Sequence, residues 1–299
     1  MKDLTVDELA QRMSDFMANI LTHSEDAAKI SPTNVLTNES WWIGFTHVLE
    51  ELSLRGESWR QPAVDMKNHL VMPRSDRVMK SMALTKQNAF VKDGQHYKFG
   101  KREHMEALLN RGIVRIAPAS SFASAELNGA RRDDELSLET KPSRSDLEAL
   151  CRRDAIGPPA KEVVEARAWS YVTQAKTDYF VYCMAERFDH RLFDDFEADA
   201  CLVIRDPSVF EQRLRLHVGG GLDSWKAYST QVDYIDPLFP PLETLNPFFC
   251  KHFRFFYQRE YRHLWIPPKE PGPLKPFFAD LGSLTDIAEV VTLHFQPSK

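Results

Sequence analysis

Residues Phe248 to Pro267, FFCKHFRFFYQREYRHLWIP, form the stretch around which we expect the fold to be organised. Its second half, Tyr257 to Ile266, is rich in aromatic residues and predicts a β-strand, in which successive side chains point to opposite faces. Gln258, Glu260 and Arg262 would then share one face. A carboxylate beside an amide on such a strand either forms an ion pair with a neighbouring arginine or lines the edge of an active site.

The composition is that of a folded protein. The 299 residues are 43% hydrophobic and 27% charged, which is close to globular averages and argues against wholesale disorder. The net charge of −5 argues against nucleic-acid binding through bulk positive charge, while a local basic surface remains open. The four cysteines never form a CxxC pair, so the sequence supports neither a disulfide framework nor a cysteine zinc site.

The first residues and the hydropathy pattern predict a cytoplasmic protein. The first residues, MKDLTVDELAQRM, are polar and acidic, unlike a secretory signal peptide. We find no run of about 18 apolar residues, so we expect no transmembrane helix and no membrane partner.

Residues 1–90 are predicted to form a helical N-terminal extension. Thr5 and Glu8 match a capping box, and the helix that they begin carries an apolar stripe as far as Ile20. A second predicted helix contains the tandem tryptophans Trp41-Trp42. We interpret the two helices as a layer that covers the core, with a partner-binding surface as the alternative.

Residues 91–299 are predicted to form one α+β domain. Short strands are expected at 96–100, 113–117, 179–185, 201–204, 276–281 and 290–295. Helices are expected at 101–110, 145–153, 161–174, 208–215 and 284–289. This order lacks the regular alternation of a doubly wound sheet and predicts a mixed or antiparallel sheet.

Two polar segments leave their role open. The acids between Asp189 and Glu197 would need to converge in space to bind magnesium or calcium, and an acidic connecting helix is the favoured interpretation. The segment 119–140 contains Arg131 and Arg132 and reads as a solvated loop, with a loop across a ligand site as the alternative.

Three segments, HYKF followed by LLNRGIVRIAPASSF, YFVYCMAERFDHRLFDDFEADACLVI and YQREYRHLWIP, resemble in their order a large uncharacterised bacterial family. Its members share a "YKY … CxS … ExEYR" pattern, and the resemblance extends from Gln95 to Val291. The sequence departs from that pattern at Met184-Ala185, where the family has cysteine and serine. It also has RRDDE where the family more often has an Asn-Asp-Pro turn.

This layout is similar to the ADP-ribosyltransferase fold, including the DarT-type enzymes that modify nucleic acid. The resemblance implies a transferase that uses NAD, with Glu260 as the catalytic carboxylate and Gln258 two residues before it. It also implies a toxin or phage-defence effector, a nucleic-acid or protein acceptor, and a neutralising antitoxin or chaperone. Contacts to NAD are implied for the following residues: His96, Tyr97, Arg115, Ser120, Arg131 and Arg132.

The chemistry suits these residue types without a metal. Loss of nicotinamide from NAD passes through an oxocarbenium-like state, which a carboxylate can stabilise. Aromatic and basic residues near Glu260 are predicted to form a surface for single-stranded nucleic acid: Arg254, Phe255, Phe256, Tyr261, Arg262 and Trp265. Two other classes remain open, namely a non-enzymatic binding or sensor module that docks a partner through residues 253–265, and a metal-dependent nuclease that uses the acids at 189–197.

Overall fold

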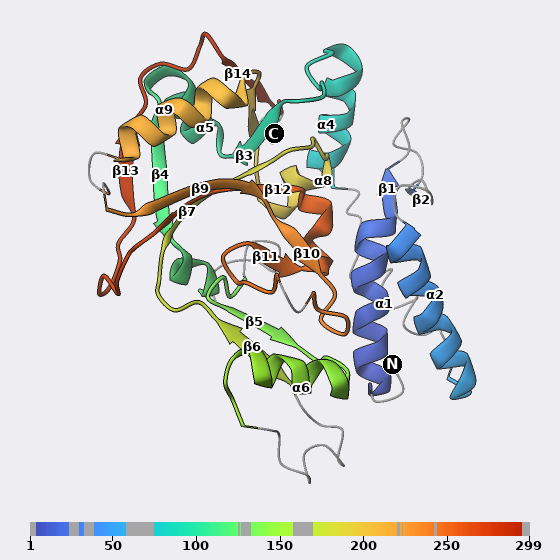
Figure 1. The fold of residues 1–299 in the computed structure, drawn as a ribbon. Helices are drawn as coiled ribbons and strands as arrows, with labels where there is room; N and C mark the ends of the chain where they lie inside the picture. Colours follow the sequence, from blue (N-terminus) through green and yellow to red (C-terminus); the bar gives the residue numbers. More distant parts are fainter. Residues whose placement is uncertain are drawn as a thin grey trace.

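The computed structural model describes residues 4–23, 30–32, 39–57, 75–124, 126, 133–157, 170–219, 222, 224–241 and 244–294. They form a mixed α+β protein around an eight-stranded sheet whose paired strands run antiparallel (Figure 1). The predicted class, α+β with a mixed or antiparallel sheet, is therefore confirmed. None of the described helices has the length and apolar composition that crossing a membrane requires.

The elements have the following bounds. The strands of the main sheet are β3 (His96–Gly100), β4 (Ile113–Pro118), β7 (Phe180–Ala185), β8 (Ala200–Ile204), β9 (Lys226–Gln231), β12 (Glu260–Ile266), β13 (Phe277–Asp280) and β14 (Ala288–Thr292). Three two-stranded sheets pair β1 (Leu21–His23) with β2 (Ile30–Pro32), β5 (Ser137–Thr140) with β6 (Tyr171–Gln174), and β10 (Asp233–Ile235) with β11 (Cys250–His252). The helices are α1 (Val6–Ile20), α2 (Glu39–Leu54), α4 (Asp76–Gln87), α5 (Arg102–Arg111), α6 (Arg144–Arg153), α8 (Arg191–Asp195) and α9 (Pro207–Gly219), with 3₁₀ helices η2 (Ala119–Ala123) and η3 (Phe253–Gln258).

Strand β7 is central, and one of its edges is shared by two different neighbours. Along one edge β12 pairs with the whole strand. Along the other edge β4 pairs with Phe180 and Val181, whereas β3 pairs with Ala185. In the described sheet, residues 182–184 have no strand partner on that edge. The main sheet is therefore split over the middle of β7.

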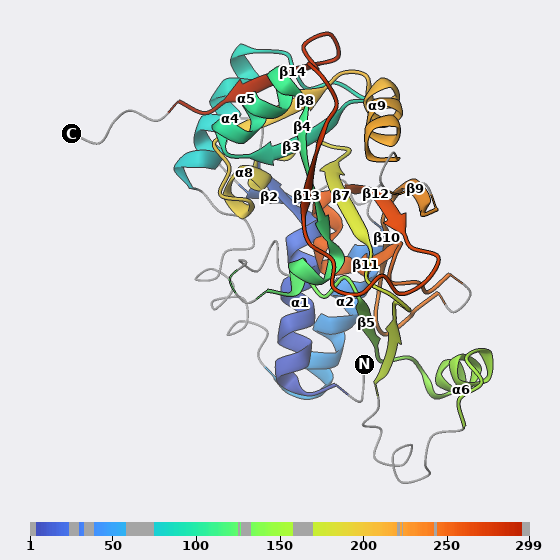
Figure 2. The same cartoon turned by 90° about the vertical axis from the view of Figure 1, so that its left-hand side faces the viewer.

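Helices cover both faces of the sheet (Figures 1 and 2). On one face α5 and α9 bury Leu108 and Phe210 against Tyr182 and Leu202. On the other face α8 buries Phe193 against the aromatic residues of β3 and the interior of β8. Because side chains alternate along each strand, each face of the sheet has its own apolar core. The split along β7 interrupts the sheet that separates these two cores.

The N-terminal helices pack on η3 rather than on the main sheet. Helix α1 begins after Thr5 with the predicted capping box to Glu8, and its apolar stripe packs with α2 and Phe253 in one buried cluster. The amide of Asn19 donates from Nδ2 to the carbonyl of Phe253 at 2.8 Å, and its Oδ1 accepts from the backbone N–H of Tyr257 at 3.0 Å. Helix α1 therefore supports the segment that precedes β12.

Three predicted elements are wrong at least in part. The helix expected over 161–174 can be checked only at its C-terminal end, because residues 161–169 lie outside the described residues. At that end Tyr171–Gln174 is the strand β6, which pairs with β5. The helix expected at 284–289 is a turn that leads into β14, because Ala288 already pairs with β8. The strand expected from Tyr257 begins only at Glu260, because Arg259 has the left-handed conformation (φ 44°) that interrupts a strand.

Candidate functional site

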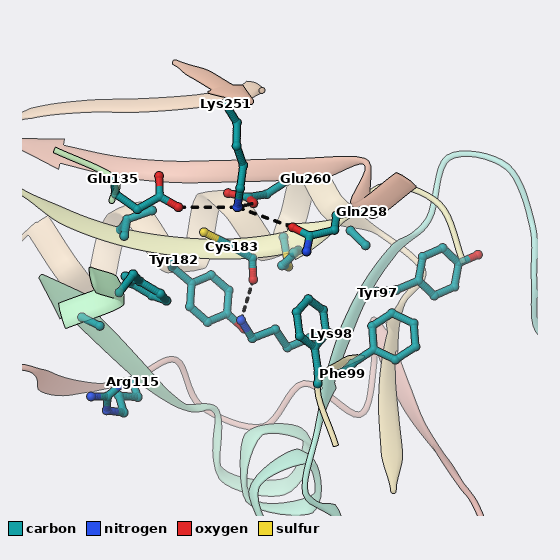
Figure 3. Close-up of a pocket in the computed structure, with 16 residues that line it drawn as sticks. Tyr97, Lys98, Phe99, Arg115, Glu135, Tyr182, Cys183, Lys251, Gln258 and Glu260 are labelled. Atoms are coloured by element: carbon teal, nitrogen blue, oxygen red, sulfur yellow. Dashed lines mark hydrogen bonds and ion pairs between the residues drawn. The ribbon is translucent and has the colours of Figure 1, made fainter. Parts of the chain in front are cut away.

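A cavity of about 320 Å³ lies at the split in the sheet (Figure 3). Its walls come from β3, β4 and β7, and from the junction of η3 with β12. The separation of β3 from β4 creates the space, because in a continuous sheet a neighbouring strand would occupy it. The charged residues that line the cavity are Lys98, Arg115, Glu135, Lys251 and Glu260.

Glu260 is the first residue of β12 and lies at the cavity wall with only 7% of its surface exposed. Its backbone N–H donates to the hydroxyl of Tyr234 at 2.8 Å. Gln258, the last residue of η3, lines the same cavity. The left-handed turn at Arg259 connects the two, so the Q-x-E spacing places both side chains at one cavity without a continuous strand.

Glu260 belongs to a buried network of opposite charges. Its Oε2 accepts from Lys251 Nζ at 2.9 Å, and its Oε1 accepts from Arg262 Nε at 2.6 Å. Glu135 is the second carboxylate, 2.5 Å from Arg262 and 3.5 Å from Lys251. Lys251 also lies 3.4 Å from Gln258 Oε1 and 3.7 Å from Asp133. Lys251 therefore holds the loop at 133–135, η3 and β12 together.

The network shifts the pKa values of its members in different directions. At Glu135 burial outweighs Arg262 and Lys251 and raises the pKa of the acid. Burial alone would raise the pKa of Glu260, but Arg262 and Lys251 outweigh it and hold the pKa well below its usual range. Burial would likewise lower the pKa of Lys251, but Glu260 and Glu135 raise it above the ordinary value. Glu260 is therefore a carboxylate and Lys251 an ammonium at neutral pH. A protonated lysine is not a nucleophile, so the carboxylates are the groups of this network that could stabilise a developing positive charge.

Lys98 occupies the split itself. Its Nζ donates to the carbonyl oxygen of Cys183 at 2.6 Å and lies 4.5 Å from the centroid of the Tyr182 ring. The carbonyl belongs to the part of β7 that has no strand partner on this edge. A lysine thus satisfies a backbone acceptor that the split would otherwise leave buried and unpaired, and it brings a positive charge to the cavity.

The cavity brings together four of the predicted site residues: Glu260, Gln258, Tyr97 and Arg115. Arg115 is exposed at its edge. Tyr97 is only 1% exposed, and its hydroxyl donates to the carbonyl of Lys92 at 3.1 Å, so its ring rather than its hydroxyl forms cavity wall.

Other predicted contacts to NAD lie elsewhere. His96 points to the face of β3 opposite to Tyr97 and contacts Tyr261, with 4.6 Å between the ring centroids and the rings tilted by 44°. Ser120 donates from its hydroxyl to Asp178 at 2.7 Å and does not line the cavity. Arg131 and Arg132 lie outside the described residues.

The predicted aromatic and basic surface is wrong for three of its six members, which are buried. Arg262 is fully buried and Trp265 is 3% exposed, and the strand directs them to opposite faces of the sheet. Phe255 is also buried, at 3%. Arg254 remains exposed, with its guanidinium carbon 4.4 Å from the Phe255 ring centroid. Tyr261 is partly exposed and shares a 3.4 Å hydrogen bond with Glu211.

Three residues of the network were not predicted as site residues: Lys251, Glu135 and Asp133. Lys251 stands in the opening stretch, but its spacing from Glu260 gives no sign that a chain reversal through η3 brings the two together. Glu135 lies more than one hundred positions earlier in a polar segment. Only covariation between distant positions, which indicates contact in space, could have identified it.

The acids at 189–197 mostly serve local structure. Asp195 pairs with Arg191 at 2.8 Å, and Asp189 accepts from the backbone N–H of Arg191. Asp194 lies 3.9 Å from Arg77. No group of three His, Cys, Asp or Glu side chains in the described ranges is arranged to hold a metal ion.

A scan against models of protein families, a search of curated proteins and a search of solved structures each find no match.

Proposed function

We propose that this protein is an NAD-dependent ADP-ribosyltransferase-like effector with Glu260 as its catalytic carboxylate. The observation that carries the proposal is the shared cavity, in which Glu260 and Gln258 lie together with Tyr97 and Arg115 at the split of the sheet. These residues supply a carboxylate, an amide, an aromatic ring and a guanidinium. Such groups suit a ligand that contains a sugar, an aromatic base and phosphates.

Glu260 would stabilise the positive charge that develops on the ribose as the bond to nicotinamide breaks. A fixed charge in a site shielded from water acts more strongly than the same charge in solvent. A carboxylate offers about four lone-pair sites. Lys251 and Arg262 each use one, so Glu260 retains acceptor capacity for a ribose hydroxyl.

The other residues would bind and orient. Arg115 at the cavity edge has the planar fork of donors that suits phosphate oxygens. Gln258 would hydrogen-bond the acceptor nucleophile without adding charge. The volume of about 320 Å³ is at the low end for ligand pockets, so we assign the cavity to the nicotinamide-ribose end of NAD rather than to the whole dinucleotide.

We assign the second substrate to nucleic acid or protein, and the biological role to a toxin or phage-defence effector with a neutralising partner. These assignments depend on the resemblance of the sequence to the uncharacterised bacterial family and to the ADP-ribosyltransferase fold.

The test is release of nicotinamide from NAD, measured by chromatography, with single-stranded DNA, RNA and protein acceptors in separate reactions. Glu260→Gln keeps the shape of the side chain and an oxygen acceptor but removes the charge. We expect it to lower the rate by about 100-fold or more, as loss of one preorganised electrostatic group does. Glu139→Gln makes the same chemical change at an exposed position on β5 and should leave the rate unchanged.

One observation favours a second candidate, a non-enzymatic binding or sensor module. Both oxygens of Glu260 are already bound to cations, which is also what a purely structural ion pair requires. If the unmodified protein releases no nicotinamide under any of these conditions, while Glu260→Gln lowers the melting temperature, the structural role replaces the catalytic one.

A further inference from the structure

A second hollow adjoins the cavity. It has a volume of about 800 Å³ and is lined by the turn at residues 91–95 together with Glu186, Arg187 and Arg259. Tyr97 lines both spaces, so a ligand in one lies close to a ligand in the other. No pattern in the sequence connects Arg187 with Arg259, which are far apart in the chain.

Arg259 is held in an unfavourable backbone conformation. Its φ of 44° and ψ of 54° lie in the left-handed region, which a residue with a Cβ atom seldom adopts. Its carbonyl accepts the backbone N–H of Glu186 at 2.8 Å, and its guanidinium carbon lies 3.4 Å from the centroid of the Phe256 ring. The conformation and the side chain are thus both fixed. Strained residues of this kind concentrate at functional sites.

The positive charges of the hollow are incompletely neutralised. Among the described residues, neither Arg187 nor Arg259 forms an ion pair or a side-chain hydrogen bond with a carboxylate. The nearby carboxylate of Glu186 accepts instead from Gln231 Nε2 at 2.7 Å. Burial, with a contribution from Arg187, lowers the pKa of Arg259 to about 10. Arg187 therefore disfavours the charged form of Arg259, Glu186 offsets part of this effect, and an anion between the two guanidinium groups would offset more of it.

We infer that this hollow is a binding site for phosphate groups, with Arg187 and Arg259 as its ligands. The forked donors of arginine match phosphate oxygens. Lys92 adds a third positive charge to the lining of the hollow, which also contains two carboxylates, those of Asp93 and Glu186. The phosphates belong either to a dinucleotide whose sugar enters the cavity or to the backbone of a polynucleotide. The site does not depend on catalysis by Glu260.

Direct binding tests the site. ADP-ribose is titrated by calorimetry, and a fluorescent single-stranded oligonucleotide by anisotropy, into the parent protein and two variants. The variants are Arg187→Gln and Arg259→Asn, since asparagine tolerates the left-handed conformation. Arg152→Gln, an exposed arginine on α6, is the matched control. Circular dichroism verifies that each variant is folded, and Arg187 is exposed, so its substitution tests the site even if Arg259→Asn fails to fold.

We expect each variant to weaken binding about tenfold or more, and the control to match the parent. Weakening for ADP-ribose alone identifies a dinucleotide. Weakening for the oligonucleotide, with a salt dependence reduced by about one unit of slope per arginine, identifies a polynucleotide. Either result supports the site even if the parent releases no nicotinamide, which would refute only the proposed function. The inference is overturned if the parent binds neither probe or if both variants bind as tightly as Arg152→Gln.

Discussion

Arg262 and Glu260 lie two positions apart on β12 and form a buried ion pair, with Arg262 Nε 2.6 Å from Glu260 Oε1. Strand geometry explains the pair, because residues i and i+2 share a face. Arg262 has no exposed surface and also contacts Glu135. One guanidinium thus contacts two buried acids, which makes the candidate site part of what stabilises the fold.

Removal of Arg262 is expected to destabilise the protein strongly. In Arg262→Met, Lys251 alone would remain to compensate Glu260 and Glu135. Breaking a buried ion pair by removing one partner costs about 3–5 kcal/mol, and we expect a loss of that order in the free energy of unfolding, measured with urea. Arg254→Met, an exposed arginine on η3, should change it by about 0.5 kcal/mol or less. Equal losses in the two variants would contradict the compensating role of Arg262.

Gly112 should not tolerate a side chain. It ends α5 with φ 65°, and a Cβ there would clash with the backbone oxygen of Gly282. Gly112→Ala therefore combines backbone strain of about 1–2 kcal/mol with a contact that only a backbone shift relieves. Gly272→Ala isolates the strain, because Gly272 also has positive φ but open space around it. Thermal unfolding should show the larger decrease for Gly112→Ala, and equal decreases would argue against the close approach to Gly282.

Asn19 is expected to join α1 to the candidate site. Asn19→Ala removes the hydrogen bonds to Phe253 and Tyr257 and leaves backbone groups unsatisfied, which costs about 1–3 kcal/mol for each buried group. Gln11→Ala removes an exposed bond to Asp15 on the same helix and serves as the control. Hydrogen exchange should show faster exchange at residues 253–260 in Asn19→Ala alone. Unchanged exchange would mean that α1 does not stabilise this segment.

Two histidines, the buried His263 and the half-buried His252, should make stability decrease on the acid side of neutrality. Burial is the main cause that lowers the pKa of His263 and of His252 to about 3, whereas an unfolded histidine titrates near about 6.5. Above that pH each histidine is neutral in both the folded and the unfolded protein, so its titration does not change the free energy of unfolding. As the pH falls from 6.5 toward 3, the unfolded chain binds protons that the folded protein does not bind. Each histidine then lowers the free energy of unfolding by up to about 1.4 kcal/mol per pH unit.

Urea unfolding between pH 7 and pH 5 measures this slope before most carboxylates titrate. His263→Gln should reduce the slope, and His104→Gln, at an exposed position on α5, should leave it as it is. If the slope is the same in His263→Gln and in the parent, His263 does not contribute to the pH dependence of stability.

Local patterns predicted most elements, because their causes are local. The capping box at Thr5, the strand HYKFG and the glycine that ends α5 each depend on neighbouring residues and are confirmed. The start of β12 was placed too early, because no local rule predicts that Arg259 turns left-handed. The sequence also placed Arg262 on a binding surface, although charged residues can be buried when distant partners compensate them.

By itself, the sequence determined the α+β class, the succession of strands and helices, and the placing of Glu260 and Arg262 on one strand face. These follow from side-chain periodicity and capping, which act over a few residues. Only the tertiary structure decided that the sheet splits over β7, that Lys251 and Glu135 join Glu260 in one buried network, and that Arg187 lies with Arg259 at one hollow. Such contacts depend on chain segments far apart in sequence, whose packing no single stretch, including residues 248–267, can specify.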